Sequence, residues 1–189
     1  KINPKFAFNQ EKIRSAKNII EIRNGSIGYK EIVLSKISLQ LDSSQRMAIK
    51  GNNGSGKTTL IRAIMSDECV FVSGEWEKPS KKDIGYLDQF YDGFYGDSPF
   101  DEMKYNMLSA NDQEIRRHLN CYLFSANEQV HADIESLSGG ERARLSMAVI
   151  ASRPFKLLVL DEPTNNIDLE TKGHLIEVLN NYNGSLLVI

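Results

Sequence analysis

Membrane-length apolar runs, paired cysteines and an excess of positive charge are all missing from this sequence. The longest apolar runs, at 157–160 and 186–189, fall far short of the roughly 20 residues that cross a bilayer, so we expect no direct membrane insertion. The two cysteines form no CxxC pair and no metal-binding spacing, which indicates reduced thiols in a cytoplasmic protein. A net charge of −2 gives no support to a strongly basic, nucleic-acid-binding surface.

Both ends of the sequence also lack the features of a complete chain. No methionine begins it, and residues 1–17 carry positive charge without the apolar centre of a signal peptide. The last residues, 186–189, form an apolar, strand-like run with nothing after it. We therefore expect a piece of a longer protein, with residues 1–17 as a linker or helix end and residues 18–189 as one domain.

The residues that are present have the composition of a globular domain. Apolar residues make up 41% and charged residues 25% of the 189 positions, which allows a substantial core. Strand patterns occur at 19–43, 47–50, 84–87, 156–160 and 185–189. Helical patterns occur at 57–65, 101–124, 140–152 and 170–179. Within the first strand region, Ile37, Leu39 and Leu41 alternate with polar residues, as in a half-buried strand.

The order of these patterns predicts the fold class. Strands that alternate with helices are typical of a parallel sheet between helices, so we expect a three-layer α/β core. The strands before residue 43 indicate an N-terminal antiparallel β-subdomain. The mostly helical stretch 98–136 interrupts the alternation, and we assign an inserted helical subdomain to about 96–146.

A glycine-rich loop joins the strand at 47–50 to the helix at 57–65. It matches the phosphate-binding pattern GxxxxGK[ST] in its required strand-to-helix context. The predicted nucleotide-binding residues are Gly51, Asn52, Asn53, Gly54, Ser55, Gly56, Lys57, Thr58 and Thr59. Glycines let backbone N–H groups surround phosphate oxygens, while the Lys57 ammonium binds the β- and γ-phosphates and the Thr58 hydroxyl binds Mg²⁺. The alternative is an accidental glycine-rich strand-to-helix turn, which chance rarely produces in a chain of this length.

An apolar strand at 157–160 ends in two acids, Asp161 and Glu162. In a phosphate-loop fold, the first acid can hold Mg²⁺ through water, and the second is placed to orient or deprotonate the attacking water. A buried strand that simply meets solvent at two acids is the plainer alternative.

The helix at 140–152 begins with Ser138, Gly139, Gly140 and Glu141. The serine and glutamate form a capping box, which any helix can use. The two glycines are unfavourable in a first turn, by about 0.5–1 kcal/mol each relative to alanine, and this indicates close approach to a ligand. A helix N-terminus with a serine hydroxyl is also a suitable anion site.

Three motifs in this order, GNNGSGKTT, LSGGE and LLVLDEPTNNID, resemble the Walker A, signature and Walker B with D-loop of the ATP-binding-cassette (ABC) family. The resemblance implies that Gln89 senses Mg²⁺ and the γ-phosphate, and that Tyr29 stacks on adenine. It implies that Ser138 and Gly139 contact ATP held by a second cassette, and that Asp168 belongs to a D-loop that reaches across to it. The switch histidine of this family would lie beyond residue 189.

Within this family the sequence is most similar to the C-terminal cassette of the ABC-F subfamily. LSGGERARLSMA and DEPTNNID resemble that subfamily, although its D-loop usually reads TNHLD, so that Asn166 and Ile167 depart from it. ABC-F proteins carry two cassettes in one chain and several act on the ribosome, which implies Mg-ATP hydrolysis and contact of the full-length protein with the ribosome or RNA. The resemblance leaves open whether the second cassette comes from the same full-length chain or from a homodimer. The alternative is the ATPase subunit of a membrane transporter.

Overall fold

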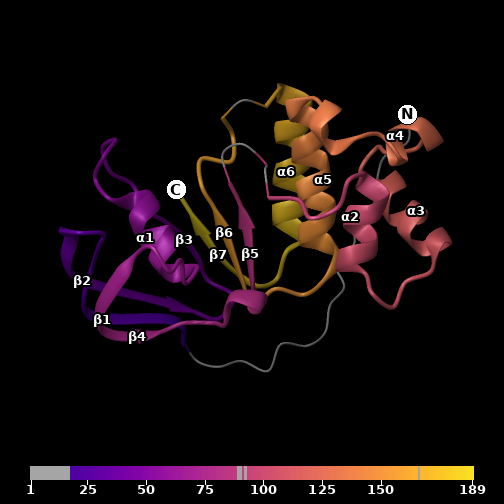
Figure 1. Cartoon of the computed structure of the whole chain (residues 1–189). Helices are drawn as coiled ribbons and strands as arrows, with labels where there is room; N and C mark the ends of the chain where they lie inside the picture. Colours follow the sequence, from indigo (N-terminus) through magenta and orange to yellow (C-terminus); the bar gives the residue numbers. More distant parts are fainter. Residues whose placement is uncertain (1–17, 89–90, 92, 166) are drawn as a thin grey trace. The chain divides into compact units, whose positions relative to one another are not determined.

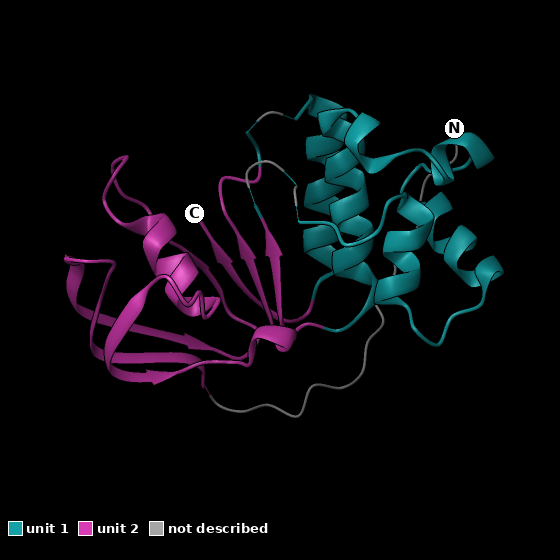
Figure 2. Ribbon diagram, viewed as in Figure 1, with its two compact units in different colours: residues 1–11, 88–154, 164–182 teal, residues 12–87, 155–163, 183–189 magenta. Residues whose placement is uncertain are grey.

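The computed structural model describes residues 18–88, 91, 93–165 and 167–189, shown in Figure 1. It divides into two compact units, coloured separately in Figure 2. The sheet unit contains residues 18–87, 155–163 and 183–189. The helical unit contains the described residues of 88–154 and 164–182.

The first sheet of the sheet unit is antiparallel and has the order β2-β1-β4. It consists of β1 (Asn18–Gly28), β2 (Ile32–Asp42) and β4 (Phe71–Glu77). The two N-terminal strands confirm the predicted antiparallel β-structure, and Ile37, Leu39 and Leu41 are among the less exposed residues of β2. Strand β4 was not predicted, because its residues alternate little between apolar and polar. It also contains Gly74, at φ +89°, and glycine is uncommon inside strands.

The second sheet is parallel and has the order β3-β7-β6-β5, as the alternation of strands and helices predicted. Its strands are β3 (Arg46–Ala48), β5 (Ile84–Leu87), β6 (Leu157–Leu160) and β7 (Ser185–Val188). All four residues of β6 are buried, and β6 pairs with a strand on each side. A central parallel strand is covered on both faces, which explains its uninterrupted apolar sequence.

Helix α1 (Lys57–Ile64) and the short 3₁₀ turn η1 (Lys81–Asp83) complete the sheet unit. Helix α1 buries Leu60, Ile61 and Ile64 in a core shared with β1 and β6. This packing fixes the direction of α1, and therefore of the loop that precedes it.

The helical unit contains five α-helices and one 3₁₀ turn among its described residues. They are α2 (Pro99–Asn106), α3 (Asp112–Cys121), α4 (Asn127–Val130), η2 (Ile134–Ser136), α5 (Gly139–Ser152) and α6 (Leu169–Asn181). The single helical stretch expected at 101–124 is broken at 107–111, because Asn111 accepts from Glu114 N–H and starts a new helix with a capping box. Ile115, Leu119 and Tyr122 are buried together, as their spacing predicted.

Candidate active site

The predicted phosphate loop connects β3 to α1 within the sheet unit. Gly54 and Gly56 have φ of +77° and +89°, a backbone region that other residues rarely adopt. At Gly56 a Cβ atom would also lie 2.8 Å from Leu34 Cγ, so this position has no room for a side chain. The two glycines therefore shape the loop for geometric reasons that the motif predicted.

Helix α1 begins without a side-chain cap and without an acid in its first turn. Its N-cap is Gly56, which has no side chain to offer, so the first N–H groups of the helix point out of its end without an internal partner. Together with the partial positive charge of a helix N-terminus, they form an arrangement suited to an anion such as phosphate.

Lys57 is the first residue of α1, and its ammonium group reaches back over the loop. Its Nζ donates to the carbonyl oxygens of Gly51 and Asn52, both at 3.0 Å. These two neutral acceptors hold the ammonium above the loop without neutralising its charge. The lysine is therefore poised to exchange carbonyl oxygens for phosphate oxygens.

The two acids follow β6 directly. The Asp161 N–H donates to Leu87 O at 2.9 Å, and the Glu162 N–H donates to Ile189 O at 3.1 Å, so both neighbouring strands hold the chain at this turn. Glu162 has a φ of 48°, which is uncommon outside glycine, asparagine and aspartate. Strained backbone of this kind is concentrated at functional sites, because the surrounding structure must hold it in place.

The phosphate loop and the acid pair lie at the same edge of one sheet. Both follow the carboxyl ends of parallel strands, β3 and β6, which are separated only by β7. With strands spaced about 4.8 Å apart, the two strand ends are roughly 10 Å from one another. A triphosphate is long enough to interact with both.

Tyr29, the predicted adenine-stacking residue, follows β1 in the same unit and is 42% exposed. Its hydroxyl accepts a hydrogen bond from Arg62 Nη1 of α1 at 3.3 Å. The phenol is thereby tied to the helix that carries Lys57. Arg62 was not predicted as a site residue. Its only sequence signal is its position in the same helix, about one and a half turns after Lys57.

Gln89, the remaining residue predicted to face the nucleotide, lies outside the described residues. Its proposed role in sensing Mg²⁺ and the γ-phosphate therefore stays a prediction from the resemblance alone.

The signature residues lie in the helical unit, at the start of α5. Ser138 is the N-cap, and the predicted capping box is present: Glu141 N–H donates to Ser138 Oγ at 3.3 Å, and Ser138 N–H donates to Glu141 Oε2 at 2.9 Å. The Ser138 hydroxyl also donates to Glu141 Oε2 at 2.6 Å. These hydrogen bonds from Ser138 lower the pKa of Glu141 below its ordinary value.

Asp168 is the N-cap of α6 in the same unit. Its carboxylate accepts from the backbone N–H of Thr171 at 2.9 Å and from the Thr171 hydroxyl at 2.8 Å, and these bonds lower the pKa of Asp168. A Cβ on Gly140 would lie 3.2 Å from Asp168 Oδ2 and 3.4 Å from Thr171 Oγ1. The glycine of the signature turn thus allows close approach of the D-loop aspartate, a reason for this residue that the sequence did not reveal.

Comparison with known proteins agrees with this geometry. The ABC transporter family model matches residues 34–165. YheS of Haemophilus influenzae is 35% identical over 99% of this chain, and Uup of Buchnera aphidicola is 30% identical over 96%. The chain spans only 30% and 31% of the lengths of these two relatives. An ABC transporter ATP-binding protein from Pyrococcus furiosus has the same fold, with a TM-score of 0.70, 24% identity and coverage of 90% of both chains.

These matches confirm the predicted α/β phosphate-loop fold and the family resemblance. The family match covers the phosphate loop, the signature turn and the acid pair in the order in which the sequence presents them. The chain belongs to the ABC transporter family of ATPase domains.

Proposed function

We propose that the chain binds Mg-ATP at residues 51–59 and, paired with a second cassette, hydrolyses it to ADP and phosphate. The observation that carries this proposal is the shared sheet edge: the loop before the uncapped helix α1 follows β3, and Asp161 and Glu162 follow β6, at the carboxyl ends of strands in one parallel sheet. Positive and donor groups would bind the phosphate oxygens, while the carboxylates would serve the metal and water.

The residues at this edge fit Mg²⁺, which prefers oxygen ligands. Thr58 is exposed in the first turn of α1, and Asp161 is half-buried after the end of β6. We propose that Thr58 binds the metal directly and Asp161 holds it through water, with Gln89 as a further oxygen ligand. When bound, Mg²⁺ neutralises charge that develops on the phosphate oxygens.

Glu162 is the proposed general base. It would accept a proton from water as the water oxygen attacks the γ-phosphorus and the bond to the β-phosphate oxygen breaks, which releases ADP. The constrained backbone at Glu162, with its φ of 48° and its N–H bound to Ile189 O, supports a carboxylate held in one position.

The signature turn would act on ATP held by the second cassette. The first N–H groups of α5 and the Ser138 hydroxyl are suited to a γ-phosphate, since Ser138 would exchange its bond to Glu141 for a phosphate oxygen. Gly139 and Gly140 would allow close approach, and Asp168 would reach toward the facing cassette. Two half-sites, one from each cassette, would complete each reaction.

Titration with ATP tests the phosphate site. Replacing Lys57 with alanine removes the cation that lies over the loop, and we expect at least about 100-fold weaker binding, since charged hydrogen bonds contribute roughly 1.5–3 kcal/mol each. Lys81→Ala, an exposed lysine of η1, serves as the control and should bind like the unmodified protein. Unchanged affinity in Lys57→Ala would remove the assignment of the loop.

We further propose that the complete protein is an ABC-F ATPase that acts on the ribosome. Support comes from YheS and Uup, which are ABC-F family ATP-binding proteins, and from the motifs LSGGERARLSMA and DEPTNNID. No described helix is long and apolar enough to cross a membrane, a finding that a transporter ATPase subunit would share.

Co-sedimentation with ribosomes distinguishes the two candidates. The full-length Glu162→Gln protein should retain ATP and stay with ribosomes in the presence of ATP, but not in its absence. Association with a membrane-spanning partner instead of ribosomes would support the transporter subunit.

A further inference from the structure

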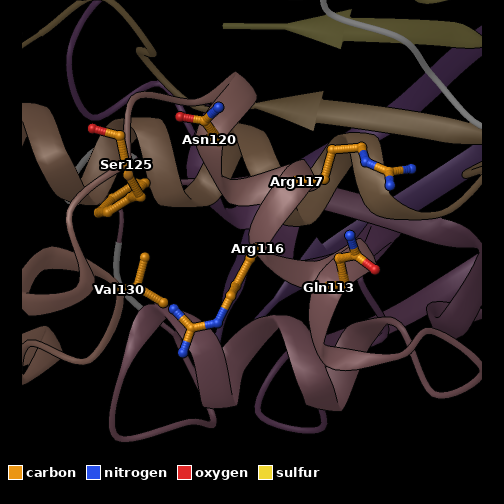
Figure 3. Close-up of a pocket in the computed structure, with 7 residues that line it drawn as sticks. Gln113, Arg116, Arg117, Asn120, Ser125 and Val130 are labelled. Carbon is orange, nitrogen blue, oxygen red and sulfur yellow. The ribbon is translucent and has the colours of Figure 1, made fainter.

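One face of α3 in the helical unit is entirely polar. Gln113, Arg116, Arg117 and Asn120 recur at helical spacing and line a cavity of about 360 Å³. Its other walls come from the segment that follows α3, where Phe124, Ser125 and Val130 lie. Figure 3 shows these side chains from both segments around the hollow.

Arg116 is held in place by three neighbours. Its Nη1 donates to Asn127 Oδ1 at 3.0 Å, its Nη2 lies 2.9 Å from His131 Nε2, and its guanidinium carbon lies 5.3 Å from the centre of the Phe100 ring. The bond to Nε2 requires that this nitrogen of His131 be unprotonated. Arg116 is thus fixed by neutral groups, and Figure 3 shows its side chain extending toward Val130.

Among the residues that the structure describes, no acid lines this cavity. In the part of the chain that the structure describes, neither Arg116 nor Arg117 forms an ion pair with a carboxylate, and the Arg117 side chain has no hydrogen bond. Two guanidinium groups on one helix face, one of them bonded to neighbouring side chains, are therefore available to an anionic partner.

We propose that this cavity binds an acidic segment of a partner protein. A carboxylate matches the planar donor pattern of a guanidinium, and the carboxamides of Gln113 and Asn120 can donate to and accept from a peptide backbone. The partner's carboxylate would sit against Arg116, and Arg117, which extends away from Arg116 in Figure 3, would bind a second acid at the rim.

The cavity fits a peptide better than a single-stranded nucleic acid. Recognition of unpaired bases depends on exposed aromatic rings for stacking. Phe124, the one aromatic side chain among the described residues that line this cavity, is 2% exposed and cannot stack on a base.

Fluorescence anisotropy of a labelled hexaglutamate peptide on the full-length protein tests the proposal. We expect saturable binding at low salt, and binding about fivefold weaker in both Arg116→Gln and Arg117→Gln, the size of effect expected for loss of one partly exposed charge pair. Arg117→Gln keeps the test valid if loss of Arg116 disturbs α4, because Arg117 has no side-chain bond to lose. Lys104→Gln, an exposed lysine of α2 outside the cavity, removes the same charge and should bind within about twofold of the unmodified protein.

Three comparison probes decide the chemical class. Neutral hexaglutamine should not bind. Equal competition by inorganic phosphate would reduce the site to a general anion site and overturn the peptide proposal. Tighter binding of a uridine hexanucleotide than of hexaglutamate, with the same dependence on Arg116 and Arg117, would assign the cavity to RNA instead. Absence of hexaglutamate binding, or equal loss in Lys104→Gln, would also overturn the proposal.

Discussion

The place where a Cβ atom would stand on Gly140 lies 3.2 Å from Asp168 Oδ2. The signature turn and the N-terminus of α6 are thus in contact through a position that only glycine fills without displacement. Because Asp168 also accepts from both polar groups of Thr171, these two hydrogen bonds oppose movement of the carboxylate. A Cβ atom at Gly140 therefore requires the Asp168 carboxylate to give way by a few tenths of an ångström.

Gly140→Ala and Gly173→Ala form a matched pair that tests this contact. Gly173 lies in α6 with nothing within 4 Å of its Cβ position, so alanine there should stabilise the protein by about 0.5–1 kcal/mol. At Gly140 the same exchange should give no such gain, because the new methyl group crowds Asp168. Urea unfolding of both variants measures the difference, and an equal gain at the two positions would contradict the contact.

Glu162→Gln should separate binding from turnover. The amide keeps the shape of the side chain but accepts no proton, so we expect hydrolysis by the full-length protein to fall about 10²- to 10⁴-fold while ATP affinity is retained. Steady-state phosphate release and ATP titration measure the two quantities. Glu177→Gln, an exposed acid of α6, is the control and should leave both unchanged. Undiminished turnover in Glu162→Gln would exclude this residue as the general base.

Ser138→Ala should cost stability in a pH-dependent way. Loss of an N-cap costs about 1 kcal/mol at neutral pH. The Ser138 hydrogen bonds hold the folded-state pKa of Glu141 below its ordinary value of 4.5. Their contribution is therefore complete above that value and is lost as the pH falls through the lower folded-state pKa.

The measurement is the free energy of unfolding at neutral pH and at about pH 3, below the ordinary carboxyl pKa. The gap between the unmodified protein and Ser138→Ala should narrow in acid. Ser136→Ala serves as the control, because its hydroxyl donates to the backbone carbonyl oxygen of Asp133 and not to a carboxylate. If the difference in unfolding free energy between the unmodified protein and Ser138→Ala is the same at both pH values, the Ser138 hydrogen bonds do not lower the pKa of Glu141.

Lys78→Met should loosen the far end of the helix that carries the phosphate lysine. Lys78 Nζ donates to Ala63 O and Ile64 O at 2.8 Å and to Ser66 Oγ at 2.6 Å, so it caps the C-terminus of α1. We expect a loss of about 1–2 kcal/mol in the free energy of unfolding, because the last carbonyl groups lose a charged donor. Lys82→Met, an exposed lysine of η1, should change stability by less than about 0.5 kcal/mol. Thermal and urea unfolding of the two variants provide the comparison, and equal effects would exclude a capping role.

The elements that carry the site could be predicted because their signals are local. The loop at 51–58 needs positive φ at Gly54 and Gly56, and only glycine adopts it readily, so sequence spacing and backbone shape correspond directly. The capping box of Ser138 and Glu141 depends on residues three positions apart in the chain. Strand β4 escaped prediction for the opposite reason, since its pairing with β1 determines it more than its own alternation does.

The sequence by itself determined the phosphate loop, the acid pair at the end of β6 and the cap of the signature helix, because each depends on backbone preferences and hydrogen bonds within a few residues. Only the tertiary structure decided that Arg62 holds the Tyr29 hydroxyl, that Asp168 lies against Gly140, and that the loop after β3 shares a sheet edge with the acids after β6. These pairs are distant in the chain, and packing of helices and sheets brings them together. No local pattern encodes that proximity.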